Sequence, residues 1–297
     1  MHAVHFSVSG VDVSPVVPVL VAFVVSAVAS MGGVSGAFLL LPFQVSVLGF
    51  TGPAVTPTNH LFNVLAAPAA IVQFAREQRM LWPLALVMLA GTLPGVIFGS
   101  LARIFLLPDP RAFKLFAGVL LLALGTRMLH ALWIAKRPPR SSAHPSATST
   151  FTFHRTRIEF TCDGLARTVS SLRIVSLTFI VGIVGGVYGV GGGAFLSPIL
   201  VGLLGLPVHA TAGASLFATF ATSSVGIAVF ALAGPLAGRP AVGPDWALGG
   251  LFGLGGLAGM YVGARLQRFV PAKLIETALA FLVTGLALSY VIGFFRP

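Results

Sequence analysis

The chain has 297 residues, of which 25 are charged (18 Lys and Arg, 7 Asp and Glu), and its mean hydropathy is +0.98. Soluble domains carry about 25% charged residues, so a charged fraction of 8% excludes an ordinary soluble enzyme, and a hydrophobic fraction of 56% excludes disorder. The formal net charge of +11 is compatible with cytoplasmic loops of a polytopic membrane protein. No basic run with interleaved aromatic residues is present, so we expect no nucleic-acid partner.

The N-terminal segment and the single cysteine limit the chemistry further. Cys162 is the only cysteine, which excludes an intramolecular disulfide and a Cys-based zinc site. The sequence Ala27-Val28-Ala29 resembles a signal-peptidase site, but residues 1–14 contain no Lys or Arg and so lack the positive region of a signal peptide. We therefore expect the N-terminus to be membrane-embedded and uncleaved.

Eight apolar segments follow in chain order, and most have the roughly 20 residues that a membrane-spanning helix needs. The first and fifth are longer, at about 33 residues, and each contains a glycine cluster, at residues 31–36 and 189–193. Glycine disfavours helix, so we predict that each long segment forms two half-helices joined by an irregular turn. We call these turns the first elbow (31–36) and the second elbow (189–193). The segments cover residues 15–48, 55–75, 82–107, 112–133, 172–204, 209–234, 244–268 and 273–294.

The two halves of the chain repeat each other. Residues 36–39 and 193–196 both read Gly-Ala-Phe-Leu, and the stretch from Trp82 to Gly99 matches the stretch from Trp246 to Gly263 without gaps. Internal duplication with broken helices is typical of secondary transporters. Within this stretch, each half has three glycines at spacings of four, which predict close approach of a neighbouring helix. They are Gly91, Gly95 and Gly99 in the first half and Gly255, Gly259 and Gly263 in the second.

Residues 134–171 form the longest polar stretch. It opens with Lys136-Arg137-Pro138-Pro139-Arg140, and Asp163-Gly164 after an alternating β-prone run predicts a small hairpin. The distribution of Lys and Arg places this linker in the cytoplasm, whether the two long segments cross the membrane or re-enter it. The short half-helices favour re-entry, which would make the repeats inverted.

We therefore predict an all-α polytopic membrane protein with two homologous four-segment repeats, each opening with a broken or re-entrant helix. Its parts are an N-terminal tail (1–14), a first transmembrane repeat (15–133), the cytoplasmic linker (134–171) and a second transmembrane repeat (172–297). The multi-pass pattern indicates a cell membrane location, with the lipid bilayer as one partner.

A binding site is expected where the two elbows meet. Irregular backbone at membrane depth is tolerated where it is buried in protein or lines a wet cavity. The N–H groups at the start of a helix are free, and together with the positive end of the helix dipole they favour an anion. The candidate backbone residues are Gly33, Ser35, Gly36, Ala37, Gly191, Gly192, Gly193 and Ala194; packing alone is the alternative.

The segments that follow the elbows add polar side chains. Asn59 and Asn63 are four residues apart and share a helix face, and Ser215 and Thr219 form a similar stripe in the second half. His60 aligns with Ser215 and could bind an anion or carry a coupled proton. The alternatives are a neutral packing histidine and hydroxyls that bond backbone carbonyls, as is common in membrane helices.

Carboxylates are nearly absent from the predicted spans. Only Glu276 lies in a helix, near its start. A cation transporter would usually place carboxylates in its core, so this composition favours an anionic substrate and predicts neither a metal site nor a cofactor. Five arginines at segment ends could attract anions or serve as topology anchors: Arg76, Arg79, Arg103, Arg265 and Arg268.

A rival interpretation comes from the sequence Gly33-Val34-Ser35-Gly36, which fits the short pattern of intramembrane serine proteases. The repeat replaces Ser35 by Gly192, which indicates a shared backbone role rather than a nucleophile. We therefore predict no enzymatic activity.

The elbows and their surroundings resemble a known family. Residues 189–198 (Gly-Val-Gly-Gly-Gly-Ala-Phe-Leu-Ser-Pro) and 33–42 (Gly-Val-Ser-Gly-Ala-Phe-Leu-Leu-Leu-Pro) are similar to the paired signature of the TauE/SafE sulfite exporter family. Residues 209–216 and the glycines spaced by four agree with it. The resemblance covers nearly the whole chain except residues 1–14 and the linker. Ala214 stands where family members often have Thr, and Thr-Asn-His at 58–60 replaces a simpler hydroxyl pair, which bears on the choice of anion.

The resemblance implies an inner-membrane carrier that moves small sulfur-containing or carboxylated anions, such as sulfite, sulfonates or sulfoacetate, chiefly outward. Our hypothesis is alternating access by a monomer or homodimer, in which the two repeats rock about the central site. Backbone N–H groups would bind the anion, and a coupled proton or the membrane potential would set the direction. An anion channel and a carrier of small carboxylates remain open. The side chains expected to orient the anion are Asn59, His60, Asn63, Ser215 and Thr219.

Overall fold

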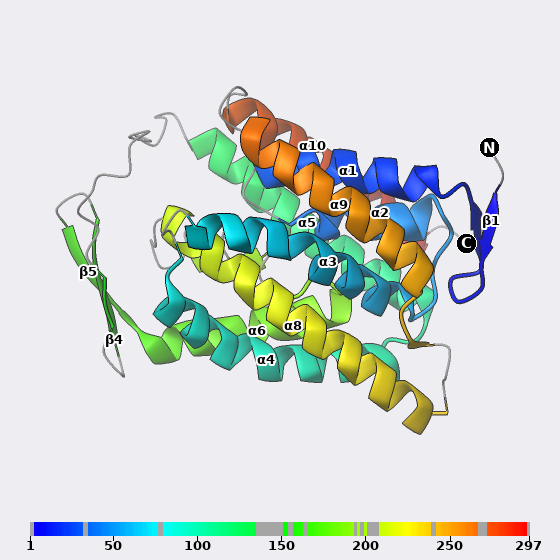
Figure 1. Cartoon of the computed structure of the whole chain (residues 1–297), viewed down its shortest axis with the longest axis horizontal. Coiled ribbons are helices and arrows are strands. Elements are labelled where there is room, and N and C mark those ends of the chain that lie inside the picture. Colours follow the sequence, from blue (N-terminus) through cyan, green and yellow to red (C-terminus); the bar gives the residue numbers. More distant parts are fainter. Residues whose placement is uncertain are drawn as a thin grey trace.

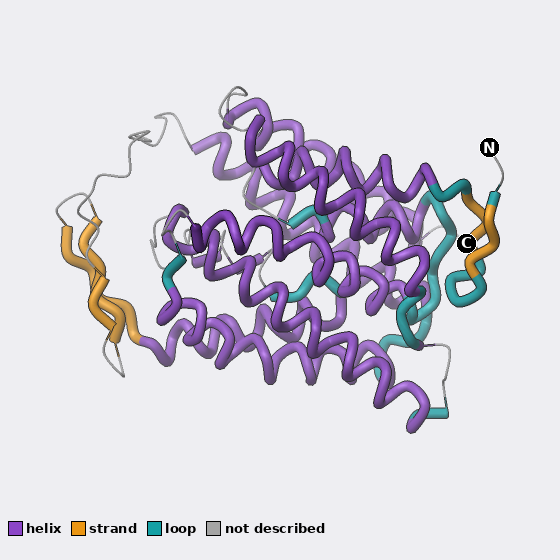
Figure 2. The backbone as a smooth tube through the Cα atoms, viewed as in Figure 1, coloured by secondary structure: helices purple, strands orange, loops and turns teal. Residues whose placement is uncertain are grey.

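The computed structural model is a bundle of long helices with two small β-structures at opposite ends (Figure 1). It describes residues 3–31, 35–76, 80–134, 151–153, 157–162, 165–192, 195–196, 199–200, 208–238, 242–266 and 272–295. Figure 2 shows that helices account for nearly all of the bundle and that the loops lie mainly at its ends. The predicted fold class, an all-α polytopic membrane protein, is confirmed.

The helices fall where the hydropathy pattern predicts them. In the first half they are α1 (Val16–Met31), α2 (Ala37–Ser46), α3 (Val55–Arg76), α4 (Trp82–Phe105) and α5 (Pro110–Ile134). In the second half they are α6 (Ser171–Tyr188), α8 (Val208–Leu236), α9 (Trp246–Leu266) and α10 (Ala272–Phe295).

Four of the described helices are long and apolar enough to cross a membrane. They are α4, α6, α8 over Thr211–Leu236 and α9 over Trp246–Gly263. Helix α3 is not among them, since Thr, Asn and His residues occupy its first half. Among these polar residues, Asn59, His60 and Asn63 are the ones that the sequence analysis assigns to the binding site.

Glycine determines where the two long segments are interrupted. In the first segment, α1 ends at Met31 and α2 begins at Ala37. In the second, α6 ends at Tyr188, and Gly189 and Gly191 have φ angles of +82° and +62°. This left-handed backbone is strained for residues with a Cβ, so glycine ends α6 there. A side chain at Gly189 would also lie 2.5 Å from the carbonyl oxygen of Thr56.

The glycines spaced by four allow close helix approach, as predicted. In α4, a Cβ on Gly91, Gly95 or Gly99 would collide with the backbone of α6, and in α9 a Cβ on Gly255, Gly259 or Gly263 would collide with α1. Helix α4 therefore packs on α6, and α9 packs on α1.

The other extensive helix contacts also cross between the two halves of the chain. Helix α3 packs on α8 and α9, α8 packs on α3 and α4, and α5 packs on α10. In the two halves α1 corresponds to α6, α3 to α8, α4 to α9 and α5 to α10. If each of these helices is replaced by its counterpart, the same set of contacts results. The halves therefore interlock around one core, as a duplicated chain would produce. The duplication itself stays a prediction from the sequence.

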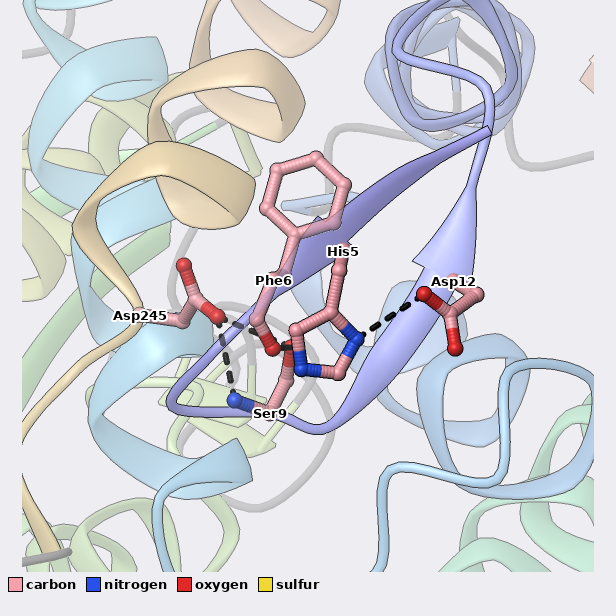
Figure 3. Close-up of polar contacts among 5 residues, drawn as sticks. All are labelled: His5, Phe6, Ser9, Asp12 and Asp245. Atoms are coloured by element: carbon pink, nitrogen blue, oxygen red, sulfur yellow. Dashed lines mark hydrogen bonds and ion pairs between the residues drawn. The ribbon is translucent and has the colours of Figure 1, made fainter. Parts of the chain in front are cut away.

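The starts of α1, α3 and α9 gather at one end of the bundle. Asp245, just before α9, accepts hydrogen bonds from the backbone N–H of Ser9 at 3.1 Å and from its hydroxyl at 2.8 Å (Figure 3). The backbone N–H of Asp245 donates to Oγ1 of Thr58, near the start of α3, at 2.9 Å. Because α1 and α3 start at the same end of the bundle, the first long segment begins at that end and the chain is back at the same end when α3 begins at Val55.

The corresponding segment of the second half enters from the opposite end. Gly213, near the start of α8, packs on Phe74 at the end of α3 and on Met80 just before α4. Early in α6, Val175 and Thr178 contact Gly91, in the first half of α4. Helices α6 and α8 thus start together, at the end of the bundle that carries the linker strands in Figure 1.

Two small antiparallel sheets complete the described structure. β1 (Val4–Phe6) and β2 (Val11–Val13) form a hairpin within the predicted N-terminal tail. In the linker, β3 (Phe151–Phe153) pairs with β4 (Arg157–Cys162), which pairs with β5 (Leu165–Ser170). Cys162 lies opposite Leu165, so β4 and β5 flank the Asp-Gly dipeptide on which the hairpin prediction rests.

Candidate functional site

Asn63 links the two elbows. Its Oδ1 accepts a hydrogen bond of 2.8 Å from the hydroxyl of Ser35 in the first elbow, and its Nδ2 donates one of 2.9 Å to the carbonyl of Val190 in the second. Ser35 is 2% exposed and Asn63 is fully buried. One amide side chain on α3 therefore joins two interruptions that lie about 155 residues apart in the sequence.

Asn59, one turn earlier on α3, holds the start of α2. Its Nδ2 donates to the carbonyl of Ala37 at 3.0 Å, and its Oδ1 accepts from Nε2 of Gln44 at 3.3 Å. The backbone N–H of Ala37 donates to the Ser35 hydroxyl at 3.3 Å. Four of the predicted site residues, Ser35, Ala37, Asn59 and Asn63, thus lie together.

Gln44 belongs to the same hydrogen-bonded cluster through Asn59, and the sequence analysis does not select it. It is fully buried on α2, and its Oε1 has no hydrogen-bond partner in the described part of the chain. The signal that could have identified it is a lone amide in an otherwise apolar half-helix, because a polar group is costly inside a membrane and is therefore a candidate for function.

Two tyrosines fasten α2 to the rest of the bundle. Pro42 has no N–H, so it cannot bond the carbonyl of Phe38 one turn earlier, and the hydroxyl of Tyr188 donates to that carbonyl at 2.9 Å. The hydroxyl of Tyr290 donates to the carbonyl of Pro42 at 3.1 Å and accepts from Ser46 at 2.9 Å. The position of Tyr188 next to the second elbow is the only sequence signal for this role.

The second elbow packs on the polar face of α8. The backbone N–H of Gly192 donates to Oγ1 of Thr222 at 3.4 Å. A Cβ on Gly191 would lie 2.7 Å from the Ser223 hydroxyl oxygen and 3.0 Å from both the Thr219 carbonyl and the Thr222 hydroxyl. Only glycine permits this approach, and the hydroxyls of α8 lie directly against the elbow backbone.

The hydroxyls predicted in α8 differ in their bonding. The hydroxyl of Thr219 donates to the carbonyl of Ser215 in its own helix at 2.9 Å, which is the alternative role noted for membrane helices. The Ser215 hydroxyl is buried and has no hydrogen-bond partner among the described residues. Of the two, Ser215 has the hydroxyl hydrogen free for a ligand.

His60 faces α8 rather than the first elbow. Its Nδ1 lies 3.2 Å from the Ser223 hydroxyl, and a Cβ on Gly226 would lie 2.8 Å from its Nε2. The ring is fully buried, with its centroid 6.5 Å from that of Phe230. Gly226 leaves room for the imidazole, and Ser223 connects it to the second elbow, since Ser223 also contacts Gly191.

Gly33, Gly193 and Ala194 lie outside the described residues, so their predicted contribution stays a prediction. Gly36 and Gly192 are described, and both pack tightly. A Cβ on Gly36 would lie 2.9 Å from the Ser26 hydroxyl oxygen of α1, and one on Gly192 would lie 2.7 Å from Cγ2 of Thr92 of α4. The elbows are held by helices on several sides.

The cluster as a whole is enclosed and uncharged. Ser35, Asn59, His60, Asn63, Ser215 and Thr219 are 0–3% exposed. Asp245, the one buried acidic residue among those described, lies at the end of the bundle before α9. Within the described residues, no group of three His, Cys, Asp or Glu side chains could hold a metal ion. The arrangement therefore offers backbone and neutral side-chain groups to a ligand.

The family model for the sulfite exporter TauE/SafE matches residues 19–290. The chain belongs to the TauE/SafE sulfite exporter family. The family predicted from the elbow sequences is therefore confirmed, and the matched range includes both elbows, α3 and α8. No solved structure matches the chain.

A curated relative of this TauE/SafE member is the probable membrane transporter protein YunE of Bacillus subtilis. The two are 21% identical over 267 residues, which cover 87% of this chain and 89% of YunE. Together with the apolar helices, the family and this relative identify the chain as a membrane transporter.

Proposed function

We propose that this transporter exports small sulfur-containing anions of the sulfite, sulfonate or sulfoacetate class by alternating access. The observation that carries the proposal is the Asn63 bridge between the elbows, with its hydrogen bonds to Ser35 and Val190. A ligand that binds between the elbows would compete with or reinforce these bonds. Binding would then be coupled to the relative position of the two halves.

The chemistry of the site supports an anion. The described cluster contains hydroxyl, amide and imidazole groups and no carboxylate, and the first turn of α2 directs its backbone N–H groups toward the first elbow. Neutral donors can coordinate an oxyanion without the charge that would hold it too tightly. In our proposal Asn59, Asn63 and Ser215 donate to the anion, and His60 and Thr219 pack around it.

The arrangement of the elbows supports alternating access. The segment with the first elbow enters from the end of the bundle where Asp245 lies, and the segment with the second elbow enters from the opposite end. Rocking of one half against the other would open the enclosed cluster to each end in turn. In a membrane this geometry corresponds to re-entrant segments and inverted repeats, which we propose for this protein.

The membrane potential gives a direction if the linker is cytoplasmic, as the charge distribution predicts. Moving one negative charge outward across an inside-negative membrane is favourable by about 2.3 kcal/mol per 100 mV. A uniporter could therefore export the anion without a coupled ion, and proton coupling through His60 is the alternative. We propose the inner membrane as the location and a monomer or homodimer as the assembly.

Flux of labelled sulfite in proteoliposomes tests the proposed function. Purified protein should produce saturable uptake that an outwardly directed gradient of unlabelled sulfite accelerates by counterflow, and sulfoacetate should compete. Protein-free liposomes provide the control. Absence of flux for sulfite, small sulfonates and small carboxylates would contradict the anion assignment, and flux that rises linearly with concentration without counterflow would indicate a channel.

The contacts of Ser35 favour a transporter over a serine protease. Its hydroxyl is bonded to the amide of Asn63, and the imidazole of His60 is bonded to Ser223. A nucleophilic serine needs a base within hydrogen-bond reach. We therefore propose that the protein is not an enzyme. A Ser35→Ala variant should keep measurable transport, whereas a protease would lose all activity.

A further inference from the structure

Arg103 is the largest fully buried side chain among the described residues. It lies near the end of α4, in the last turn before the exposed Leu106. No Asp or Glu in the described part of the chain forms an ion pair with it. Buried charges in proteins are normally paired, so the positive charge of Arg103 needs an explanation.

The protein engages two of the three guanidinium nitrogens. Nε donates to the Thr56 hydroxyl at 3.2 Å, and Nη1 donates to the carbonyl of Leu107. The guanidinium carbon lies 3.9 Å from the ring centroid of Phe113, so one face of the group is stacked. Nη2 is buried and has no hydrogen-bond partner among the described residues. The guanidinium group is thus held in place, while Nη2 and its two N–H bonds remain without an acceptor among the described residues.

Thr56 connects Arg103 to the second elbow. The hydroxyl that accepts from Nε of Arg103 donates in turn to the carbonyl of Val187, in the last turn of α6, at 3.2 Å. The carbonyl oxygen of Thr56 faces Gly189, where a Cβ would lie 2.5 Å away. Arg103 is therefore one side chain away from the start of the elbow that forms the candidate site.

We infer that Arg103 is an anion-binding residue, with Nη2 contacting a small oxyanion on its way between the elbow cluster and the end of the bundle opposite the linker. This inference deepens the proposed function and rests on it. An oxyanion would provide the negative charge that no Asp or Glu of the described residues provides for Arg103. The elbow cluster, whose side chains are neutral, would then bind the anion without a cationic residue of its own. Thr56 acts as a positioning residue, because it fixes the guanidinium through Nε.

The competing explanation is a structural one. Arg103 lies at the C-terminal end of α4, where the helix dipole favours a cation and where its bond to Leu107 caps the helix. A purely structural arginine would affect the stability of the protein without ligand and leave anion affinity unchanged. The two explanations therefore differ in what an anion titration measures.

The test is the dissociation constant for sulfite and for sulfoacetate, measured by calorimetry on the purified full-length protein, alongside the melting temperature without ligand. Arg103→Gln should weaken binding of both anions at least tenfold, and Thr56→Val, which keeps the arginine, should weaken it less. Arg265→Gln is the matched control. Arg265 lies in the last turn of α9, the counterpart of α4, and stacks on Tyr261 at 4.4 Å, but it is exposed.

Arg103→Lys covers the case in which the glutamine variant fails to fold, since it retains the charge but loses the planar fork. It should bind anions more weakly than the wild type, while Arg265→Lys should not. An unchanged dissociation constant in the folded Arg103 variants, with only the melting temperature lowered, would overturn the inference and leave the proposed function standing. Wild-type protein that binds none of the small anions would overturn the proposed function and this inference together.

Discussion

The hydroxyl of Ser35 donates a hydrogen bond of 2.8 Å to the side-chain amide of Asn63. Ser35 lies in the first elbow, after α1, whereas Asn63 lies in α3, which follows that elbow in the sequence. The same amide reaches Val190 in the second elbow. Both elbows therefore depend on one residue. This dependence makes the role of Asn63 open to direct measurement.

Replacement of Asn63 by Ala should impair both stability and transport. It leaves the Ser35 hydroxyl and the Val190 carbonyl without their partner in a buried site, and an unsatisfied buried polar group costs about 1–3 kcal/mol. We expect a lower melting temperature and a loss of most sulfite flux in proteoliposomes. Ser289→Ala is the control, because its exposed hydroxyl bonds only the carbonyl of Leu286 in its own helix. Normal flux in Asn63→Ala would show that the bridge is dispensable.

Replacement of Gly192 by Val should abolish transport and leave the protein folded. The Cβ alone would lie 2.7 Å from the Thr92 side chain, so the added isopropyl group must displace α4 or the elbow backbone. Sulfite flux and size-exclusion behaviour measured together check both parts of the prediction. Gly52→Val is the matched control, since a Cβ at Gly52 meets nothing within 4 Å. Equal flux in the two variants would remove the second elbow from the site.

Two glycines of α9 should respond differently to the same substitution. A Cβ on Gly255 would collide with the backbone of α1 at Val19, while one on Gly250 meets nothing within 4 Å. Gly255→Ala should destabilise by about 1–3 kcal/mol through overpacking. Gly250→Ala should be neutral or stabilise by up to about 1 kcal/mol, since Ala favours helix over Gly. Melting temperatures in detergent, read side by side, test the contrast, and a similar change in both would speak against the close packing of α1 on α9.

Replacement of Asp245 should lower the stability of the protein more than replacement of Asp12. Both residues are associated with the N-terminal hairpin: Asp245 accepts hydrogen bonds from Ser9 between its strands, and Asp12 lies in β2. Asp245 is buried, accepts two bonds from Ser9, and caps α9 by accepting from the N–H of Leu248 at 3.0 Å. Loss of such a cap costs about 0.5–2 kcal/mol. Asp12 contacts His5 at 2.8 Å on the exposed surface, and exposed pairs of this type contribute little. Asp245→Ala should therefore lower the melting temperature clearly and Asp12→Ala should not. The reverse order would contradict the anchoring role.

Cysteine labelling should place the N-terminal hairpin and the linker on opposite sides of the membrane. In a background with Cys162 replaced by Ser, exposed Val8 and Thr152 offer sites in the hairpin and in β3. An impermeant maleimide added to intact cells should label Val8→Cys and Gly52→Cys, and should reach Thr152→Cys only after permeabilisation. Labelling of Val8→Cys and Thr152→Cys from the same side would mean that the first long segment crosses the membrane.

Much of the fold can be predicted from the sequence because its signals are local. A membrane helix must be apolar over about 20 residues, and glycine is the residue that most readily adopts the backbone found at Gly189 and Gly191. Hydropathy therefore places the helices within one or two residues, and the glycine clusters mark both interruptions. The polar residues of α3 are conspicuous for the same reason, since Asn59 and Asn63 interrupt an apolar segment.

The partners of these polar side chains depend on which residues lie close together in space, and a single sequence does not show this. The sequence by itself determines that Asn59, His60 and Asn63 lie on one helix after the first elbow. Only the tertiary structure decides that Asn63 reaches the second elbow while His60 turns to Ser223, because a side chain's partner depends on which helices pack together. Arg103 shows the same limit: at the end of an apolar segment it has the signature of a topology anchor. Only the packing of α4 against its neighbours buries Arg103 against Phe113 and brings it to Thr56, and the anion-binding role that we propose rests on these contacts.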